Sequence, residues 1–120
     1  MFVFVAILMV SQQPVPPLLE GTASYYTVAS SSPYTASGEI LRDDAFTCAL
    51  REGEFGEYYL IVAENGNSVV CRLNDRGPFH SGRVIDLSKA AMRELDLTAG
   101  LVPVTVYRLG TSPPPIPEEP

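Results

Sequence analysis

The strongest constraint on the fold comes from residues 57–73, where two β-rich runs flank the dipeptide Asn65-Gly66. The first run, EYYLIVA, has apolar side chains at both alternating positions, which predicts a strand buried on both faces. The second run alternates and places Val69, Cys71 and Leu73 on one face. Asn and Gly both tolerate positive φ, so the two runs predict a β-hairpin.

The remaining segments favour a small β fold with one helix. Residues 101–109 alternate Val with other residues, which predicts a terminal strand whose Pro103 lies where no backbone donor is needed. Ser88 suits the N-cap of the run KAAMRELD, and Leu87, Ala91 and Leu95 recur at helical spacing. Many short strands and one helix predict a mainly β architecture, a small barrel with few exposed edges.

Proline marks both borders of the predicted folded unit. Residues 12–19, QQPVPPLL, predict an extended linker, and residues 112–120, SPPPIPEEP, predict a polyproline II tail. We therefore expect three parts. An apolar run with its linker occupies residues 1–20, a folded domain residues 21–110, and a disordered proline-rich tail residues 111–120.

The apolar run at residues 1–10, MFVFVAILMV, bears on where the protein acts. It is shorter than the roughly 20 residues that a membrane-spanning helix needs, and it has the length of a signal-peptide core. No Lys or Arg precedes it and no clear small-residue cleavage site follows, so a buried strand is the alternative. We expect export, to the periplasm, the cell envelope or the extracellular space.

Charge and composition exclude several functions. The net charge of −6 lacks the electrostatic signature of nucleic-acid binding, so nucleic acid is excluded as a partner. Cys48, Cys71 and the single histidine, His80, do not occur at metal-ligand spacing, so we expect no metal and no cofactor. The two cysteines are either buried thiols or one disulfide, and the export signals favour the disulfide.

Two carboxylates stand where predicted strands end. Gly77 and Pro78 terminate the second hairpin strand and display Asp75 at the barrel rim, and Asp86 lies two residues before the N-cap Ser88. Both strands should meet at the same rim, so we expect the two carboxylates to line one groove. Paired carboxylates in different environments can act as acid and base. On the residues alone a structural role is the stronger interpretation, because Asp often braces loops or caps helices.

Several strings of residues, taken together, carry a resemblance to a known family. They are GTASYY at 21–26, TASGE at 35–39, NDRGPF at 74–79, GRVIDLSKAA at 82–91 and VPVTVYRL at 102–109. In this order they resemble the rare lipoprotein A (RlpA) type of six-stranded double-psi β-barrel with one or two short helices, related to expansins and family-45 endoglucanases. The resemblance implies an endolytic lytic transglycosylase that cleaves peptidoglycan glycan strands and leaves 1,6-anhydro-muramyl ends.

The resemblance also implies roles for individual residues. Asp75 is expected to protonate the glycosidic oxygen, with Asp86 in support. By strand alternation one of the two adjacent tyrosines should point into the core. For Ser24, Thr35 and Glu39, a role in turn and strand structure is an equal alternative to substrate binding. For His80, an exposed loop position is the stronger interpretation. The expected substrate-binding residues are Ser24, Tyr25, Tyr26, Thr35, Glu39, Arg76 and His80.

One position departs from the family pattern. Catalytic relatives tend to carry Thr-Ala-Ala-His after the TASGE segment, and the matching quartet here is TCAL at 47–50. Leu50 cannot transfer a proton, so a non-catalytic, expansin-like glycan-binding module is the alternative to an enzyme. A third interpretation is a structural partner of envelope or division-site proteins. Cys48, beside the missing histidine, suggests adaptation of this strand for a disulfide to Cys71, and we expect a monomer.

Overall fold

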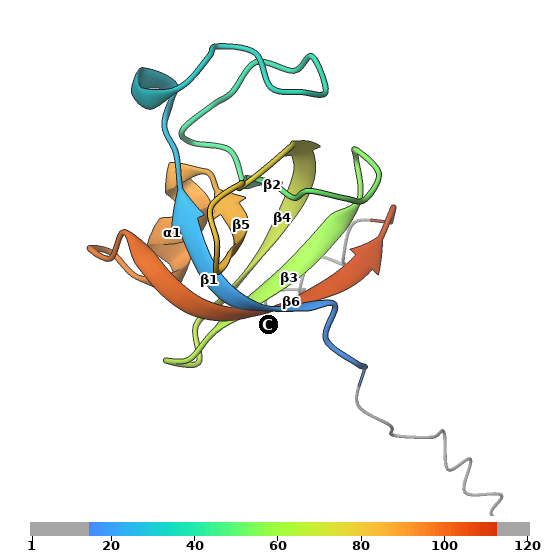
Figure 1. The fold of residues 1–120 in the computed structure, drawn as a ribbon, viewed down its shortest axis with the longest axis vertical. Helices are drawn as coiled ribbons and strands as arrows, with labels where there is room; N and C mark the ends of the chain where they lie inside the picture. Colours follow the sequence, from blue (N-terminus) through green and yellow to red (C-terminus); the bar gives the residue numbers. More distant parts are fainter. Residues whose placement is uncertain (1–14, 113–120) are drawn as a thin grey trace, which may run out of the picture.

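A computed structural model describes residues 15–112 as a closed barrel of six strands in the order β1-β5-β2-β4-β3-β6 (Figure 1). The mainly β, six-stranded barrel with one short helix is therefore confirmed. The predicted signal run and all but the first residue of the 112–120 tail lie outside the described residues. The elements are β1 (Leu19–Tyr25), a 3-10 turn (Val28–Ser30), β2 (Thr47–Ala49), β3 (Tyr58–Ala63), β4 (Ser68–Asp75), β5 (Arg83–Leu87), α1 (Lys89–Leu95) and β6 (Leu101–Gly110).

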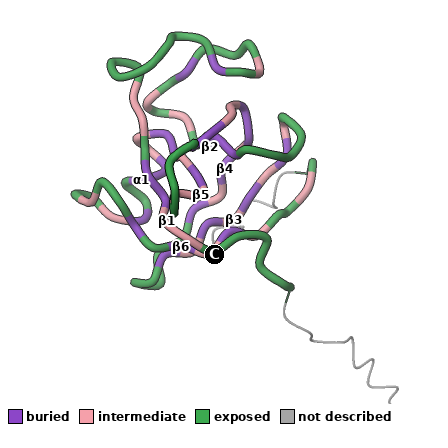
Figure 2. The backbone as a smooth tube through the Cα atoms, in the orientation of Figure 1, coloured by how far each residue is buried: buried purple, intermediate pink, exposed green. Residues whose placement is uncertain are grey.

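The barrel mixes parallel and antiparallel pairs. β1 pairs with β5 and β2 pairs with β4 in parallel, and the other neighbours are antiparallel. The long connection from β1 to β2 projects beyond one end of the barrel (Figure 1) and is largely exposed (Figure 2). Among the described residues, no helix is both long and apolar enough to cross a membrane.

The predicted hairpin is β3 and β4. Val62 pairs with Ser68, and Gly66 in the turn has φ of 90°, a conformation that glycine adopts without strain. The prediction that the first strand is buried on both faces is wrong. Residues of β3 alternate between buried and partly exposed, because its outer face forms the uncovered wall of the barrel.

Helix α1 begins as predicted. The hydroxyl of Ser88 accepts a hydrogen bond from the amide of Ala91 at 3.3 Å, which caps the first turn. Ala91, Met92 and Leu95 are buried and belong to the hydrophobic core cluster. The helix thus contributes one apolar face to the core while its other residues stay accessible.

The first strand starts two residues earlier than the predicted domain border at residue 21. Leu19 pairs with Val106, and the amide of Leu18 donates to the carbonyl of Val106 at 2.8 Å. The end of the predicted linker is ordered because β6 is ten residues long and offers backbone partners at this edge. At the other end, β6 extends to Gly110, one residue beyond the strand predicted at 101–109.

The two cysteines lie next to each other in the core. Cys48 on β2 and Cys71 on β4 are buried free thiols, so the expected disulfide is not formed in the structure. Burial, and then contact with Cys71, raises the pKa of the Cys48 thiol well above its ordinary value. The disulfide stays a prediction, and both cysteines belong to the same core cluster.

We expect Cys48 and Cys71 to form a disulfide in protein isolated from an exporting host. Folding brings the two thiols into the same part of the core, and an oxidising compartment allows the bond to form and persist. Denatured protein should resist alkylation and weigh ~2 Da less than the dithiol form, as mass spectrometry measures. Alkylation of both cysteines without prior reduction would contradict the prediction.

A buried carboxylate closes the seam between β3 and β6. Glu57 is 3% exposed, and Arg108 donates to its two oxygens at 2.6 and 2.8 Å while the hydroxyl of Tyr59 donates at 2.9 Å. These donors replace the water that burial removes. The hydrogen bonds from Arg108 hold the pKa of Glu57 below its ordinary value of 4.5.

We expect Glu57→Gln to lower the free energy of unfolding by about 2 kcal/mol, and the melting temperature by about 10 °C. Because the pKa of Glu57 is lowered in the folded state, its contribution is complete above pH 4.5 and disappears as the pH falls through the lower folded value. Melting curves from pH 7 to 3 should therefore converge for the two proteins. A constant difference at every pH would contradict this account.

Candidate active site

Four strands bring the predicted acidic residues into one row. Ser24 on β1 pairs with Asp86 on β5, Asp86 pairs with Ala49 on β2, and Ala49 pairs with Asp75 on β4. Residues in register share a face of the sheet, and strands lie ~4.8 Å apart, so the two aspartate backbones are about 10 Å apart. Ala49, between them, is 1% exposed, so the middle of the row is covered by other parts of the chain.

A bulge in β4 turns Asp75 to the outside of the barrel. Cys48 pairs with Leu73, but the next residue, Ala49, pairs with Asp75, so Asn74 is one extra residue on β4. Leu73 points into the core, and strict alternation would send Asp75 there too. The extra residue reverses this direction and aims the carboxylate toward the outer face, a common use of bulges next to active sites.

Three donors hold the carboxylate of Asp75. The hydroxyl of Tyr26 donates to Oδ2 at 2.9 Å, and the amides of Ala36 and Arg76 donate to Oδ1 at 2.8 and 2.9 Å. Two of the three donors are backbone amides, so the carboxylate of Asp75 is anchored in one orientation.

Asp86 has a different environment. It accepts one side-chain hydrogen bond, from the hydroxyl of Ser24. The turn after Asp75 passes close by, because a Cβ at Gly77 would lie 3.8 Å from Asp86 Oδ2. Gly77 has φ of 127°, which side chains rarely adopt, so this close approach depends on glycine. Asp86 thus keeps free hydrogen-bonding capacity beside the turn.

The two adjacent tyrosines both stay out of the core, so the expectation that one points inward is wrong. Tyr25 is 41% exposed, and Tyr26 lies just beyond the end of β1, where alternation no longer applies. Burial first, and the Asp75 carboxylate second, raise the pKa of Tyr26 far above its ordinary value. Tyr26 therefore remains protonated and keeps donating to Asp75.

Thr35 and Glu39 brace the segment that carries Ala36. The Thr35 hydroxyl lies 2.9 Å from the Glu39 carbonyl, to which it donates, and Arg72 donates to both Glu39 carboxylate oxygens at 2.6 and 2.8 Å. The amide of Ser37 donates to the carbonyl of Asn74 at 3.1 Å. Both predicted substrate ligands are thus engaged within the protein, and they attach this segment to β4 beside Asp75.

The side chains of Arg76 and His80 do not contact the two aspartates through hydrogen bonds. The Arg76 guanidinium stacks on the Phe55 ring at 4.1 Å and donates to the carbonyl of Gly53 at 2.7 Å. The His80 side chain is exposed and, within the described part of the chain, makes no hydrogen bond to either aspartate. Within residues 15–112 no three His, Cys, Asp or Glu side chains are grouped to hold a metal ion.

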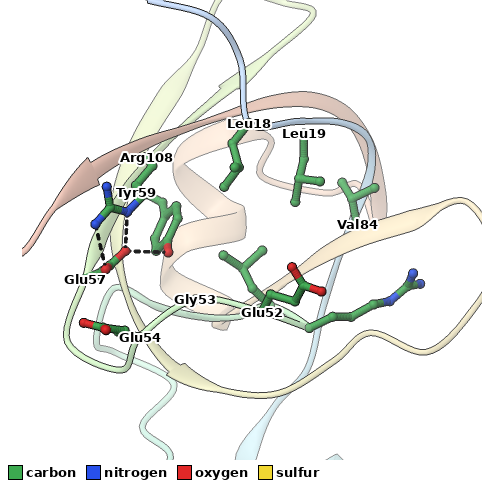
Figure 3. Close-up of a pocket in the computed structure, with 11 residues that line it drawn as sticks. Leu18, Leu19, Glu52, Gly53, Glu54, Glu57, Tyr59, Val84 and Arg108 are labelled. Atoms are coloured by element: carbon green, nitrogen blue, oxygen red, sulfur yellow. Dashed lines mark hydrogen bonds and ion pairs between the residues drawn. The ribbon is translucent and has the colours of Figure 1, made fainter.

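A separate pocket of about 480 Å³ lies at the mouth of the barrel (Figure 3). Its wall combines Leu18, Leu19 and Val84 with the Glu57–Arg108 ion pair, and Leu50 also lines it. Leu50 is 2% exposed and belongs to the core, whereas its neighbour Ala49 lies in the outer row. The side chain at position 50, where the sequence departs from the family pattern, therefore faces the barrel interior rather than the aspartates.

Comparisons with known proteins show the family to which the chain belongs. Residues 19–106 match the family model described as lytic transglycolase. The chain belongs to the lytic transglycolase family. It is 45% identical over 91 residues to the probable endolytic peptidoglycan transglycosylase RlpA of Treponema pallidum, and 42% identical over 79 residues to the RlpA transglycosylase of Pasteurella multocida. These matches cover 74% and 65% of this chain but only 29% and 27% of the relatives.

Solved structures share the fold of this lytic transglycolase domain. An expansin variant from Clavibacter michiganensis, determined with cellohexaose, has a TM-score of 0.61 at 19% identity and is matched over 80% of this chain and 52% of that one. The Streptomyces papain inhibitor has a TM-score of 0.59 at 23% identity, over 78% and 96%. At these identities the likeness concerns the barrel alone.

Sequence reasoning missed three parts of the candidate site: the backbone amide of Ala36, the intervening Ala49 and the bulge at Asn74. Ala36 and Ala49 lie in strings that the resemblance had already marked, so proximity of those strings was the available signal. No residue pattern near Asn74 predicts the bulge, and it is apparent only from the strand register.

We expect Glu39→Gln to loosen the contact between residues 35–39 and β4. The ion pair with Arg72 is partly exposed, so the loss of stability should be below about 1 kcal/mol. The amides of Ala36 and Ser37 should nevertheless exchange with solvent faster, as hydrogen–deuterium exchange measures. Asp44→Asn, which removes the more exposed ion pair with Arg42, is the control and should leave these two amides unchanged. Equal exchange in all three proteins would refute the bracing role.

Proposed function

We propose that this domain cleaves the glycan strands of peptidoglycan as an endolytic lytic transglycosylase in the cell envelope. The observation that carries the proposal is the row in which Asp75 and Asp86 flank Ala49 on one face. Membership of the lytic transglycolase family and identity to RlpA enzymes support it. Peptidoglycan lies in the envelope, which agrees with the expected export.

The reaction requires two proton movements. An acid gives a proton to the glycosidic oxygen as its bond to C1 of the muramyl sugar breaks, and a base takes the proton of that sugar's C6 hydroxyl. The C6 oxygen then bonds to C1, so the product is a 1,6-anhydro ring and no water is consumed. The two carboxylates differ in environment, as such a division of labour requires.

The hydrogen bonds favour Asp86 over Asp75 as the proton donor. Three hydrogen bonds anchor Asp75, two of them from backbone amides, which suits a base or a stabiliser of positive charge on the sugar. Asp86 accepts one side-chain hydrogen bond, from the Ser24 hydroxyl, so more of its carboxyl group is free to reach the glycosidic oxygen. This assignment reverses the roles expected from the resemblance and keeps the same pair.

A non-catalytic glycan-binding module is the second candidate, because Leu50 stands where catalytic relatives tend to carry histidine. The position of Leu50 weakens this alternative. Its side chain lines the barrel mouth, so the substitution removes no group from the row of carboxylates. The same barrel in an expansin keeps the binding hypothesis worth testing alongside the enzyme.

The deciding experiment incubates the full chain with peptidoglycan sacculi and with glycan strands freed of stem peptides. Asp75→Asn and Asp86→Asn should each reduce the rate by about 100-fold or more. Glu94→Gln, which changes an exposed carboxylate on α1, is the matched control and should keep the wild-type rate. Mass spectrometry of the soluble products identifies the chemistry.

Anhydro-ended fragments from the wild type and the control, but not from the aspartate variants, would establish the transglycosylase. Co-sedimentation with glycan without any fragments would make the domain a binding module. A wild-type protein that releases no products and does not bind glycan would overturn both functions.

A further inference from the structure

Phe79 is an exposed aromatic residue in the turn beside the carboxylate row. Its side chain is 79% exposed, the highest value among the aromatic residues that the structure describes. Burying a phenylalanine contributes about 1.5–3 kcal/mol, and this chain leaves that contribution unused. An exposed ring next to a reactive site is therefore available to a ligand.

The ring of Phe79 and the carboxylate of Asp86 both lie close to Gly77. A Cβ placed on Gly77 would lie 3.6 Å from Cε2 of Phe79 and 3.8 Å from Oδ2 of Asp86. The two groups therefore lie close to each other, with no side chain at position 77 between them. A ligand that reaches Asp86 therefore passes close to the ring.

The backbone on either side of Phe79 is clamped by one guanidinium. Arg51 Nε donates to the carbonyl of Pro78 at 2.6 Å, and Arg51 Nη2 donates to the carbonyls of His80 and Arg83 at 3.2 Å each. Gly77 and Pro78 are themselves buried. Phe79 thus projects into solvent from a fixed backbone, so little ordering is needed when a ligand binds it.

We propose that Phe79 is the stacking surface for the pyranose ring bound on the Asp86 side of the scissile bond, and that Arg51 is its positioning residue. The C–H groups on the flat side of a hexopyranose carry partial positive charge, and they pack against the negative face of an aromatic ring. The expected ligand is an N-acetylated hexopyranose of a glycan strand. This inference rests on the proposed function and adds to it the residue that selects and holds the sugar.

The first test uses the absence of tryptophan from the chain. Phe79→Trp places the only tryptophan of the chain at the stacking position, and Leu97→Trp places it at a position of similar exposure, 80%, in the connection from α1 to β6. Addition of soluble glycan strands freed of stem peptides should shift and quench the emission of Phe79→Trp only. Equal responses from both variants, or none from Phe79→Trp while the protein still binds glycan, would overturn the inference.

The second test compares kinetics on the same glycan. Phe79→Ala should raise KM by about tenfold with little change in kcat, because stacking binds the ground state and the transition state alike. Phe79→Trp should retain the wild-type KM, and Leu97→Ala is the control for loss of an exposed apolar side chain. Arg51→Ala should raise KM in the same direction, and in the Phe79→Ala background it should have little further effect.

The outcomes separate this inference from the proposed function. A wild-type protein that cleaves or binds glycan, with Phe79→Ala within twofold of it, would refute the stacking role alone. A wild-type protein with neither activity would refute the proposed function. Because Phe79 is exposed, Phe79→Ala should melt at the wild-type temperature, and a raised KM accompanied by a lowered melting temperature would count against a ligand-binding role.

Discussion

The site depends on the register of β2, a strand of only three residues held between β4 and β5. Ala49 pairs with an aspartate on each side, so hydrogen bonding of the backbone alone fixes the two carboxylates on one face. A slip of one residue would turn Cys48 outward and Ala49 inward, and would separate the pair. Buried Cys48 makes that slip costly, because its place is in the core.

The parts of the structure predicted from the sequence are those with a local signal. The hairpin around Asn65-Gly66, the cap at Ser88 and the strand end at Asp75 each follow from residues that are adjacent in the chain. The contacts of Asp75 do not, because Ala36 and Tyr26 lie 39 and 49 residues away. Their positions result from the closure of the barrel, which no window of sequence contains.

The barrel wall separates two environments within one residue. Ala49 belongs to the outer row with the aspartates, and Leu50 belongs to the inner surface at the mouth. The leucine at position 50, where the resemblance leads us to expect histidine, lines the mouth of the barrel. The chemical meaning of a substitution thus depends on which side of a single layer it faces.

The first and last strands are direct neighbours, and they run in opposite directions. Leu19 at the start of β1 is therefore paired with Val106 near the end of β6, so the polypeptide enters and leaves the barrel at nearby points. A unit with this geometry can be inserted into a longer polypeptide without stretching the flanking chain. Such modularity agrees with relatives in which the matching segment occupies less than a third of the length.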